Sequence, residues 1–252
     1  MRILLSNDDG VLARGLRALR AAFVQAGHEV FVVAPDREQS ASSHSITLDR
    51  PLRLREVEPG VHAVDGTPTD CVLVGMHGLM EQRPDLVVSG INHGPNMGED
   101  VTYSGTVAAA FEGYILGVPS LAASMRDREH GDYEAAAGVV VQLAERAHEW
   151  AGGRPVILNV NFPAGPSAEW GPVCVTRLGT RRYSDELIEK VDPRGRKYYW
   201  IGGSEPTWDE ADGTDFATVH EGGISVTPLH LDLTDERSLE SLAAVDLSEV
   251  RA

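Results

Sequence analysis

The chain has 252 residues, and its 38 acidic against 22 basic side chains give a formal net charge of −16. Phosphates of a nucleic acid or an anionic membrane repel such a protein, and no purely basic patch offsets this, so both partner classes are disfavoured. With 42% hydrophobic and 24% charged residues, we expect one globular domain (residues 1–252) with a sizeable core rather than a disordered chain.

The two cysteines and the start of the chain indicate a compartment. Cys71 and Cys174 lie far apart among apolar neighbours, which is typical of reduced, buried thiols rather than of a disulfide or a zinc knuckle. The apolar run after Met1 ends at Ser6, so it is too short for a signal peptide or a membrane span. A cytoplasmic protein is therefore expected.

Short apolar strands alternate with helical spacing over the first two thirds of the chain. Strands are expected at residues 2–6, 29–34, 85–89, 120–123 and 156–160, with helices from about residue 16 and at 67–80, 106–116 and 133–150. Because these strands are apolar throughout, they predict a mostly parallel sheet covered by helices on both faces, a three-layer Rossmann-like α/β sandwich.

Two regions depart from this alternation. Residues 46–64 alternate like a hairpin, and Thr67 and Asp70 then bracket a helix start as N-cap and capping acid. From about residue 170 the chain changes to short β-like segments, including 197–201 and 224–227, and a terminal helix at 235–244. We therefore expect a core with the active site in about residues 1–165 and a β-rich extension with a terminal helix in about 170–252.

Polar loops follow three of the expected strands. They are Asn7-Asp8-Asp9-Gly10, Asp36-Arg37-Glu38-Gln39-Ser40 and the stretch from Ser89 to Asn96. Ligands of such sheets bind beyond the carboxyl ends of the strands, where these loops meet. Two adjacent carboxylates there favour a hard divalent cation, although Asp8-Asp9-Gly10 is also compatible with an ordinary turn.

Ser104, Gly105 and Thr106 precede an alanine-rich helix. Free N–H groups at a helix start, together with two hydroxyls, suit an anion, although a plain N-cap uses the same residue types. A cation site and an anion site in one crevice indicate a phosphate ester, attacked by a metal-activated water.

Other nucleophiles and zinc are poorly supported. No Gly-x-Ser-x-Gly elbow or Asp-x-Asp pair occurs, and His28, His44 and His93, placed in or near these loops, have no second His or Cys at zinc-ligand spacing. His44 is the histidine to test as an acid or a phosphate contact. The alternative for each is a hydrogen-bonded loop histidine.

An ordered set of motifs resembles one known family. The set comprises MRILLSNDDG (1–10), VAPDR (33–37), GTPTDCV (66–72), VSGIN (88–92), GEDV (98–101), YSGT (103–106), DPRG (192–195), YWIG (199–202), GTDF (213–216) and SVTPL (225–229). It covers nearly the whole chain and is similar to the SurE (stationary-phase survival protein) family of metal-dependent 5′/3′-nucleotidases.

The resemblance implies a nucleoside monophosphate phosphohydrolase, with short polyphosphate as a further substrate. One Mg²⁺ or Mn²⁺ per subunit would be held by Asp8, Asp9, Ser40 and Asn92, with Asp8 and Asp9 as the catalytic pair. Phosphate would be contacted by Asn96, Ser104, Gly105 and Thr106. A homodimer or homotetramer that exchanges the late β-rich segment is also implied.

Two positions depart from the family pattern. Arg14 replaces a common Pro, which is expected to alter the entrance to the site. Ala41 replaces a Gly after the metal-binding Ser, and this matters only if the backbone needs a positive φ, at a cost of about 1 kcal/mol.

Two other classes stay open. A nucleotide-sugar glycosyltransferase would explain the strand at 29–34 but needs a second nucleotide-binding domain, for which 252 residues leave little room. A non-catalytic nucleotide-binding protein would not need the full set of Asp8, Asp9, Ser40 and Asn92.

Overall fold

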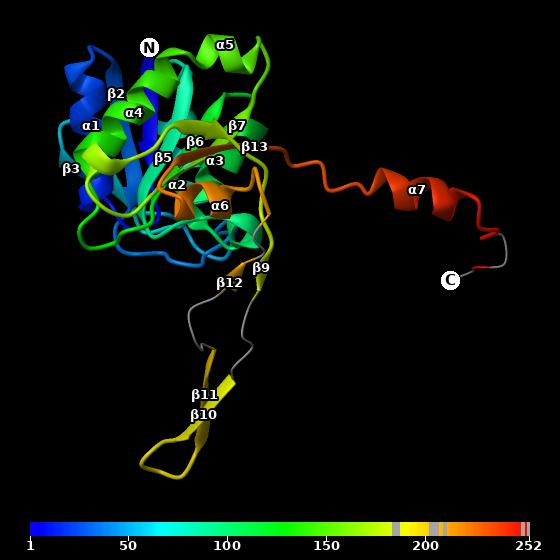
Figure 1. Cartoon of the computed structure of the whole chain (residues 1–252). Helices are drawn as coiled ribbons and strands as arrows, with labels where there is room; N and C mark the ends of the chain where they lie inside the picture. The colour runs from blue at the N-terminus through cyan, green and yellow to red at the C-terminus, as the bar shows by residue number, and fades with distance from the viewer. Residues whose placement is uncertain (183–186, 202–206, 209–210, 248–249, 251–252) are drawn as a thin grey trace.

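One large sheet organises the molecule in the computed structural model, which describes residues 1–182, 187–201, 207–208, 211–247 and 250 (Figure 1). Its nine strands lie in the order β3-β4-β2-β1-β5-β6-β7-β13-β8. Their bounds are β1 Arg2–Ser6, β2 Glu29–Pro35, β3 Leu54–Glu58, β4 Val61–Val64, β5 Leu86–His93, β6 Ser120–Met125, β7 Ile157–Phe162, β8 Val173–Val175 and β13 Ile224–Leu229. The six strands from β4 to β7 are parallel, β3 is antiparallel to β4, and β13 is antiparallel to β7.

Helices cover both faces of this sheet, which confirms the α/β fold class. The helices are α1 Arg14–Gln25, α2 Pro68–Val74, α3 Gly105–Ile115, α4 Tyr133–Glu145, α5 Ala147–Ala151, α6 Asp215–His220 and α7 Glu236–Ala243. Ile3 and Leu5 of β1 pack with residues of α1 and α4, whereas Leu4 packs on the opposite face with α2. Because alternate side chains of a strand point to opposite faces, an apolar run buries both faces at once.

Most expected elements are present, with small differences at their ends. The helix expected at 67–80 is α2 followed by a π-helical turn at Gly75–Leu79, and the helix expected at 133–150 is divided into α4 and α5. The hairpin expected over 46–64 is limited to β3 and β4. Residues 46–53 form no strand, and the amide and the hydroxyl of Thr47 both donate to the carboxylate of Asp70.

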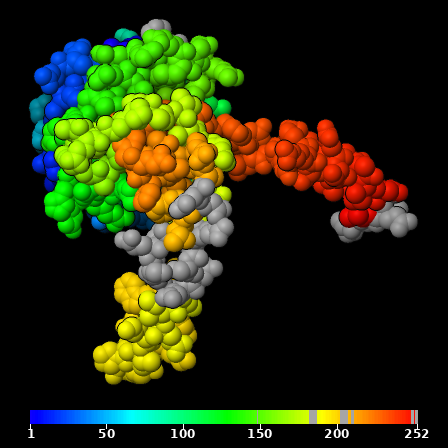
Figure 2. Space-filling model, in the orientation of Figure 1, coloured from blue at the N-terminus to red at the C-terminus, as the bar shows by residue number. Residues whose placement is uncertain are grey.

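The end of the chain differs more from expectation. The segment from about residue 170 was expected to be a β-rich extension with a terminal helix, and two of its strands, β13 and β8, belong to the main sheet. Thr227 of β13 is buried, and its hydroxyl is paired with that of Thr176 at 2.7 Å. Two other parts leave the body: the hairpin of β10 (Leu187–Val191) and β11 (Lys197–Ile201), and the C-terminal arm that carries α7 (Figures 1 and 2).

The structure also bears on the expected buried thiols and on the expected lack of a membrane span. Both cysteines are free, and Cys71 is buried as expected. Cys174 is partly exposed, because it lies on the short edge strand β8. None of the helices built by the described residues has the length and apolarity needed to cross a membrane.

Candidate active site

The candidate site is a cleft at the point where the strand order reverses. The chain leaves β1 toward β2 on one side, and β5 lies on the other side of β1, so the loops after β1 and β5 diverge. The cleft has a volume of about 500 Å³, which suits a nucleotide-sized ligand. It is lined by Asp8, Asp9, Glu38, Ser40, Ala41, Asn92, His93, Pro95, Asn96, Asp100, Tyr103, Ser104 and Arg128.

Asp8 and Asp9 form a buried carboxylate pair at the end of β1. The side chain of Asp9 is only 8% exposed, and Asp8 as a residue is 5% exposed. Burial raises the pKa of each carboxyl from 3.8 to about 6. The neighbouring charge of Asp9 also raises the pKa of Asp8, and Glu38 also raises that of Asp9. Two carboxyl groups are therefore held where their negative charge is poorly compensated.

The first turn of α3 meets this pair directly. Thr106 donates a hydrogen bond from its hydroxyl to Oδ1 of Asp8. A Cβ on Gly105 would lie 2.8 Å from Cβ of Asp8 and 2.7 Å from Oγ of Ser42, so glycine allows the three segments to approach. Ser104 caps the helix by accepting from the amide of Val107 at 3.1 Å, and it lines the cleft.

The hydroxyl of Thr106 is therefore engaged by Asp8. The residue is fully buried behind Asp8 and is absent from the cleft wall. Its hydroxyl is turned to the carboxylate because that oxygen is the strongest nearby acceptor. Gly105 is also absent from the wall, so contact of either residue with a phosphate, through its backbone N–H, stays a prediction.

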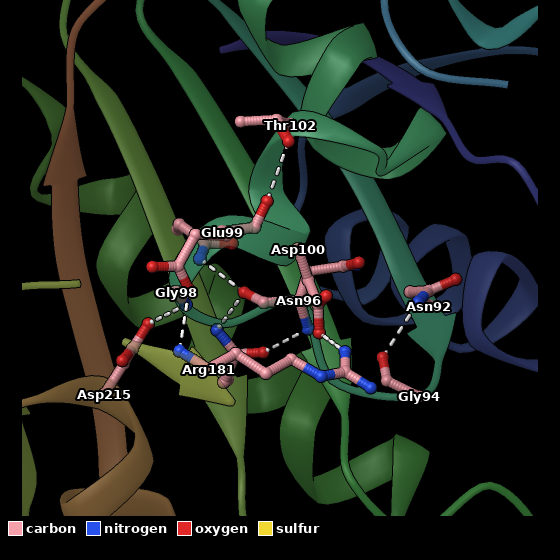
Figure 3. Close-up of polar contacts among 11 residues, drawn as sticks. Asn92, Gly94, Asn96, Gly98, Glu99, Asp100, Thr102, Arg181 and Asp215 are labelled. Carbon is pink, nitrogen blue, oxygen red and sulfur yellow. Dashed lines mark hydrogen bonds and ion pairs between the residues drawn. The ribbon is translucent and has the colours of Figure 1, made fainter. Parts of the chain in front are cut away.

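Asn92 and Asn96 enter the cleft from the segment that begins at the end of β5. Nδ2 of Asn92 donates to the carbonyl of Gly94 at 2.8 Å, which leaves Oδ1 as the oxygen available to a ligand (Figure 3). Asn96 is clamped by buried polar groups: its amide donates to Asn161 at 2.8 Å, and its Nδ2 donates to Ser124 at 2.8 Å. Its carbonyl also accepts from Asn159 and Asn161. Asn96 is thus held rigidly at the cleft.

The loop after β2 supplies Ser40 and Ala41. The amide of Gln39 donates to the carbonyl of Asp8 at 2.7 Å, so this loop is attached to the β1 loop. The hydroxyl of Ser40 donates to Glu38 at 2.6 Å. Ala41 has a φ of 58°, the left-handed conformation that favours glycine, so the positive φ on which the expected cost depends is present.

The oxygens gathered here fit a hard divalent cation. No group of three or more His, Cys, Asp or Glu side chains is arranged for a metal within the described residues, so a cation bound by Asp8 and Asp9 would need neutral oxygens as further ligands. Asp8 and Asp9 provide two negative charges, and Ser40 and Asn92 add neutral oxygens in the same cleft. Buried adjacent carboxylates with raised pKa values are the kind of donor set that such a cation stabilises.

The fold places the three candidate histidines, His28, His44 and His93, in different parts of the molecule. His93 lines the cleft, and its amide donates to Asp9 at 3.0 Å. His44 lies outside the cleft wall, 2.9 Å from the buried carboxylate of Glu112 on α3. The expectation that His28 lies near these loops is wrong. It is 3.3 Å from the amino group of Met1, at the amino ends of the strands.

Arg14 lies beside the cleft and not in its wall. Its guanidinium is 5.0 Å from the ring centre of Tyr133 and 3.0 Å from Glu134. The Tyr133 ring in turn packs edge-on against His93 at 5.5 Å. An effect of Arg14 on the entrance therefore stays a prediction, through Tyr133 and His93.

Sequence reasoning missed several cleft residues. Glu38 lies two positions before Ser40, and Asp100 and Tyr103 lie just before α3. Arg128 lies in the loop after β6, which the expected site did not include. The carboxyl-end rule that identified the other loops applies equally to this one.

The C-terminal segment holds one wall of the cleft in place. Asp215 at the start of α6 accepts from the amide of Gly98 at 2.9 Å (Figure 3) and from that of Gly179 at 2.8 Å. Arg181 pairs with Asp100, whose turn (Gly98–Thr102) precedes α3. The wall between Asn96 and Ser104 is thus attached to residues more than 70 positions later.

Together these features define a Rossmann-like α/β protein with an acidic, hydroxyl-rich ligand cleft at the switch point of its sheet. The family model described as "Survival protein SurE" matches residues 3–185. The chain belongs to the SurE family.

Similar proteins extend this relationship over nearly the full length. A protein from Geobacter sulfurreducens named 5′-nucleotidase SurE is 52% identical over 100% of this chain and 96% of its own length. One of the same name from Anaeromyxobacter sp. is 56% identical over 96% of this chain and 94% of its own. The crystal structure of the SurE protein from Aquifex aeolicus has a TM-score of 0.83 and 43% identity, covering 96% of this chain and 98% of that one.

Proposed function

We propose that this chain removes phosphate from nucleoside 5′- and 3′-monophosphates with the help of one Mg²⁺ or Mn²⁺ ion. The observation that carries the proposal is the contact between the buried carboxylate of Asp8 and the first turn of α3. It brings a cation-favouring carboxylate pair and an anion-favouring helix start into one cleft. The relatives named 5′-nucleotidase SurE support the same reaction.

Asp8, Asp9, Ser40 and Asn92 are the residues that would hold the cation. When bound, the cation would polarise a phosphoryl oxygen and lower the pKa of a water. Thr106 fixes the direction of the Asp8 carboxylate, and the amide of His93 does the same for Asp9. Both carboxylates are therefore oriented before any ligand arrives.

The phosphate would be received by groups that are already in position. Ser104 caps the start of α3, where N–H groups and the helix dipole favour negative charge. Asn96 is held by Ser124 and Asn161, so its side chain loses little freedom when a ligand binds. Such preorganised donors stabilise charge that develops on the phosphoryl oxygens during the reaction.

Phosphate release is the measurement that tests this function. The purified chain is incubated with 5′- and 3′-nucleoside monophosphates, sugar phosphates and short polyphosphate, each with Mn²⁺, Mg²⁺ or EDTA. We expect metal-dependent release that favours nucleotides and stops in EDTA. Folded protein that releases no phosphate from any substrate would instead support a non-catalytic nucleotide-binding protein.

The glycosyltransferase alternative is not favoured by this architecture. That class needs a second nucleotide-binding domain, whereas the described residues form one large sheet and two small two-stranded ones. The relatives are also of nearly the same length as this chain.

We further propose that the projecting segments join copies of this chain into a dimer or tetramer. The β10–β11 hairpin exposes apolar side chains, with Trp200 at 63% and Ile201 at 94% exposure. Leu239 and Leu242 of α7 are also more than half exposed. Such apolar surface on segments that leave the body is typical of association. A cytoplasmic location stays a prediction, consistent with two free cysteines.

A further inference from the structure

Arg128 is a cation in an otherwise acidic cleft. Asp8, Asp9, Glu38 and Asp100 all line the cleft, and Asp100 is paired with Arg181. Among the described residues of the cleft wall, Arg128 alone carries a permanent positive charge. It lies in the loop after β6, on the side of β5 opposite to Asp8 and Asp9.

The guanidinium of Arg128 packs against the backbone of the loop that bears Asn92 and Asn96. A Cβ on Gly94 would lie 2.8 Å from Nε and 2.9 Å from Nη2 of Arg128, so the guanidinium lies directly against the backbone at Gly94. Arg128 lines the same cleft as Asp9 and Asn96. The side chain is therefore directed to the cleft.

The donors of this guanidinium are unused. Within the part of the chain that the structure describes, Arg128 makes no side-chain hydrogen bond and no ion pair, and its side chain is exposed. Arg14, by contrast, is paired with Glu134, and Arg181 with Asp100. Because a guanidinium offers several N–H donors in a fixed plane, an unpaired one at a cleft wall is suited to bind an anionic ligand.

The charge balance of the cleft indicates which ligand group Arg128 meets. A divalent cation would offset Asp8 and Asp9, and Glu38 would remain negative. A phosphate monoester adds close to two negative charges at neutral pH, and a helix start offsets only about half a charge. The remaining charge must be met by another cation in the wall, and Arg128 is the residue in position.

We propose that Arg128 is a substrate-binding residue that donates hydrogen bonds to the non-bridging phosphoryl oxygens of the phosphate ester. The inference deepens the proposed function and rests on it for the identity of the substrate. Paired N–H donors match two oxygens of one phosphoryl group, which a lysine ammonium does less well. The nucleoside product has no phosphoryl oxygens, so Arg128 binds the phosphate ester and not the nucleoside. Loss of this contact after the reaction favours release of the nucleoside.

The test compares Arg128→Ala, Arg128→Lys and a control, Arg17→Ala, which removes the same charge from the exposed face of α1. Three quantities are measured with Mn²⁺ present: KM for 5′-AMP, the inhibition constant of inorganic phosphate, and phosphate binding by calorimetry. In Arg128→Ala we expect KM, the inhibition constant and the dissociation constant to rise together by about 10- to 100-fold, as for loss of hydrogen bonds to a charged group. Arg128→Lys should fall between wild type and Arg128→Ala, and Arg17→Ala should match wild type.

Three outcomes would overturn the inference. Unchanged KM and phosphate binding in Arg128→Ala would mean that the guanidinium does not touch the substrate. A raised KM for 5′-AMP with unchanged phosphate binding would assign Arg128 to the nucleoside instead. An equal rise of these constants in Arg17→Ala would mean that Arg128 contributes only long-range electrostatic attraction, which salt screens, and no hydrogen bond to the phosphate. If wild type releases no phosphate, the proposed function fails, and the calorimetric comparison still decides whether Arg128 binds phosphate.

Discussion

Asp8 and Asp9 are adjacent, buried and both acidic, which is costly for a protein without a cation at that position. Each carboxyl has its pKa raised from 3.8 to about 6 in the folded chain. The folded state therefore holds more protons than the unfolded state between about pH 4 and pH 6, and stability falls as the pH rises through this window. The cost is fully present at neutral pH.

Replacing Asp9 by Asn should therefore have opposite effects on stability and activity. In EDTA at pH 7.5 the variant should be more stable than wild type, by on the order of 1–3 kcal/mol, because one uncompensated buried charge is removed. Mn²⁺ should raise the melting temperature of wild type and not of the variant. Phosphate release should fall at least about 100-fold.

Thermal unfolding with and without Mn²⁺, together with phosphate release, measures these effects. Asp36→Asn is the matched control, because Asp36 is exposed and begins the polar loop after β2. It should leave all three quantities unchanged. A destabilised Asp9→Asn variant in EDTA would contradict the account of the carboxylate pair.

Ala41 also lowers the stability of the folded chain, through backbone strain and by a smaller amount. Its φ of 58° is unfavourable for a residue with a Cβ, and the segment adjoins Ser40. Ala41→Gly should raise the free energy of unfolding by up to about 1 kcal/mol, since relief of the left-handed strain exceeds the added entropy of glycine in the unfolded chain. Urea denaturation measures the gain. Ala41→Val, with a branched side chain at the same φ, should lower stability.

At the scale of elements, Asp215 joins three parts of the chain. Its carboxylate accepts amide hydrogen bonds from Gly98, Gly179 and Phe216, and it is fully buried. Trp208 stacks on Phe216 at 5.4 Å, and Phe216 packs with Met97 beside Asn96. The wall of the cleft thus depends on contacts made by α6.

Asp215→Ala should lower the free energy of unfolding by about 2–5 kcal/mol, because three buried N–H groups lose their acceptor. Asp215→Asn can keep the two bonds to Oδ1 and lose the one from Gly98, so it should be less destabilised. Its kcat/KM should still fall, because Gly98 lies two residues from Asn96. Urea denaturation and steady-state kinetics measure both, and Asp212→Asn, an exposed residue of the preceding turn, serves as the control.

Some of these elements could be predicted from the sequence and others could not. The central strands were predicted because their residues are apolar on both faces, and the cleft followed from where those strands end. β13 was not expected in the sheet, because Ser225 and Thr227 read as surface residues until their partners are known. The hydroxyl of Thr106 could not be oriented from sequence either, since its direction depends on Asp8, 98 positions earlier.

For the whole molecule, the projecting hairpin should determine association. Trp200→Asp places a charge on the face that Trp200 shares with Ile188 and Tyr198. Sedimentation should show a smaller species than wild type, because burying that charge in an interface is costly. Phosphate release per subunit should be retained, since neither strand of the hairpin contributes a residue to the cleft lining. Val24→Asp on α1, an equally drastic change at an exposed apolar site, should leave the sedimentation unchanged.

The position of β13 also has a consequence for biosynthesis. β8 is joined to the sheet through β13, which is made about 50 residues later and runs back along β7. While the ribosome is still translating residues 176–223, β7 is an open edge and β8 has no strand to pair with. A nascent chain that stalls in this interval therefore presents a finished parallel sheet with an unprotected border. The last strand to emerge closes it.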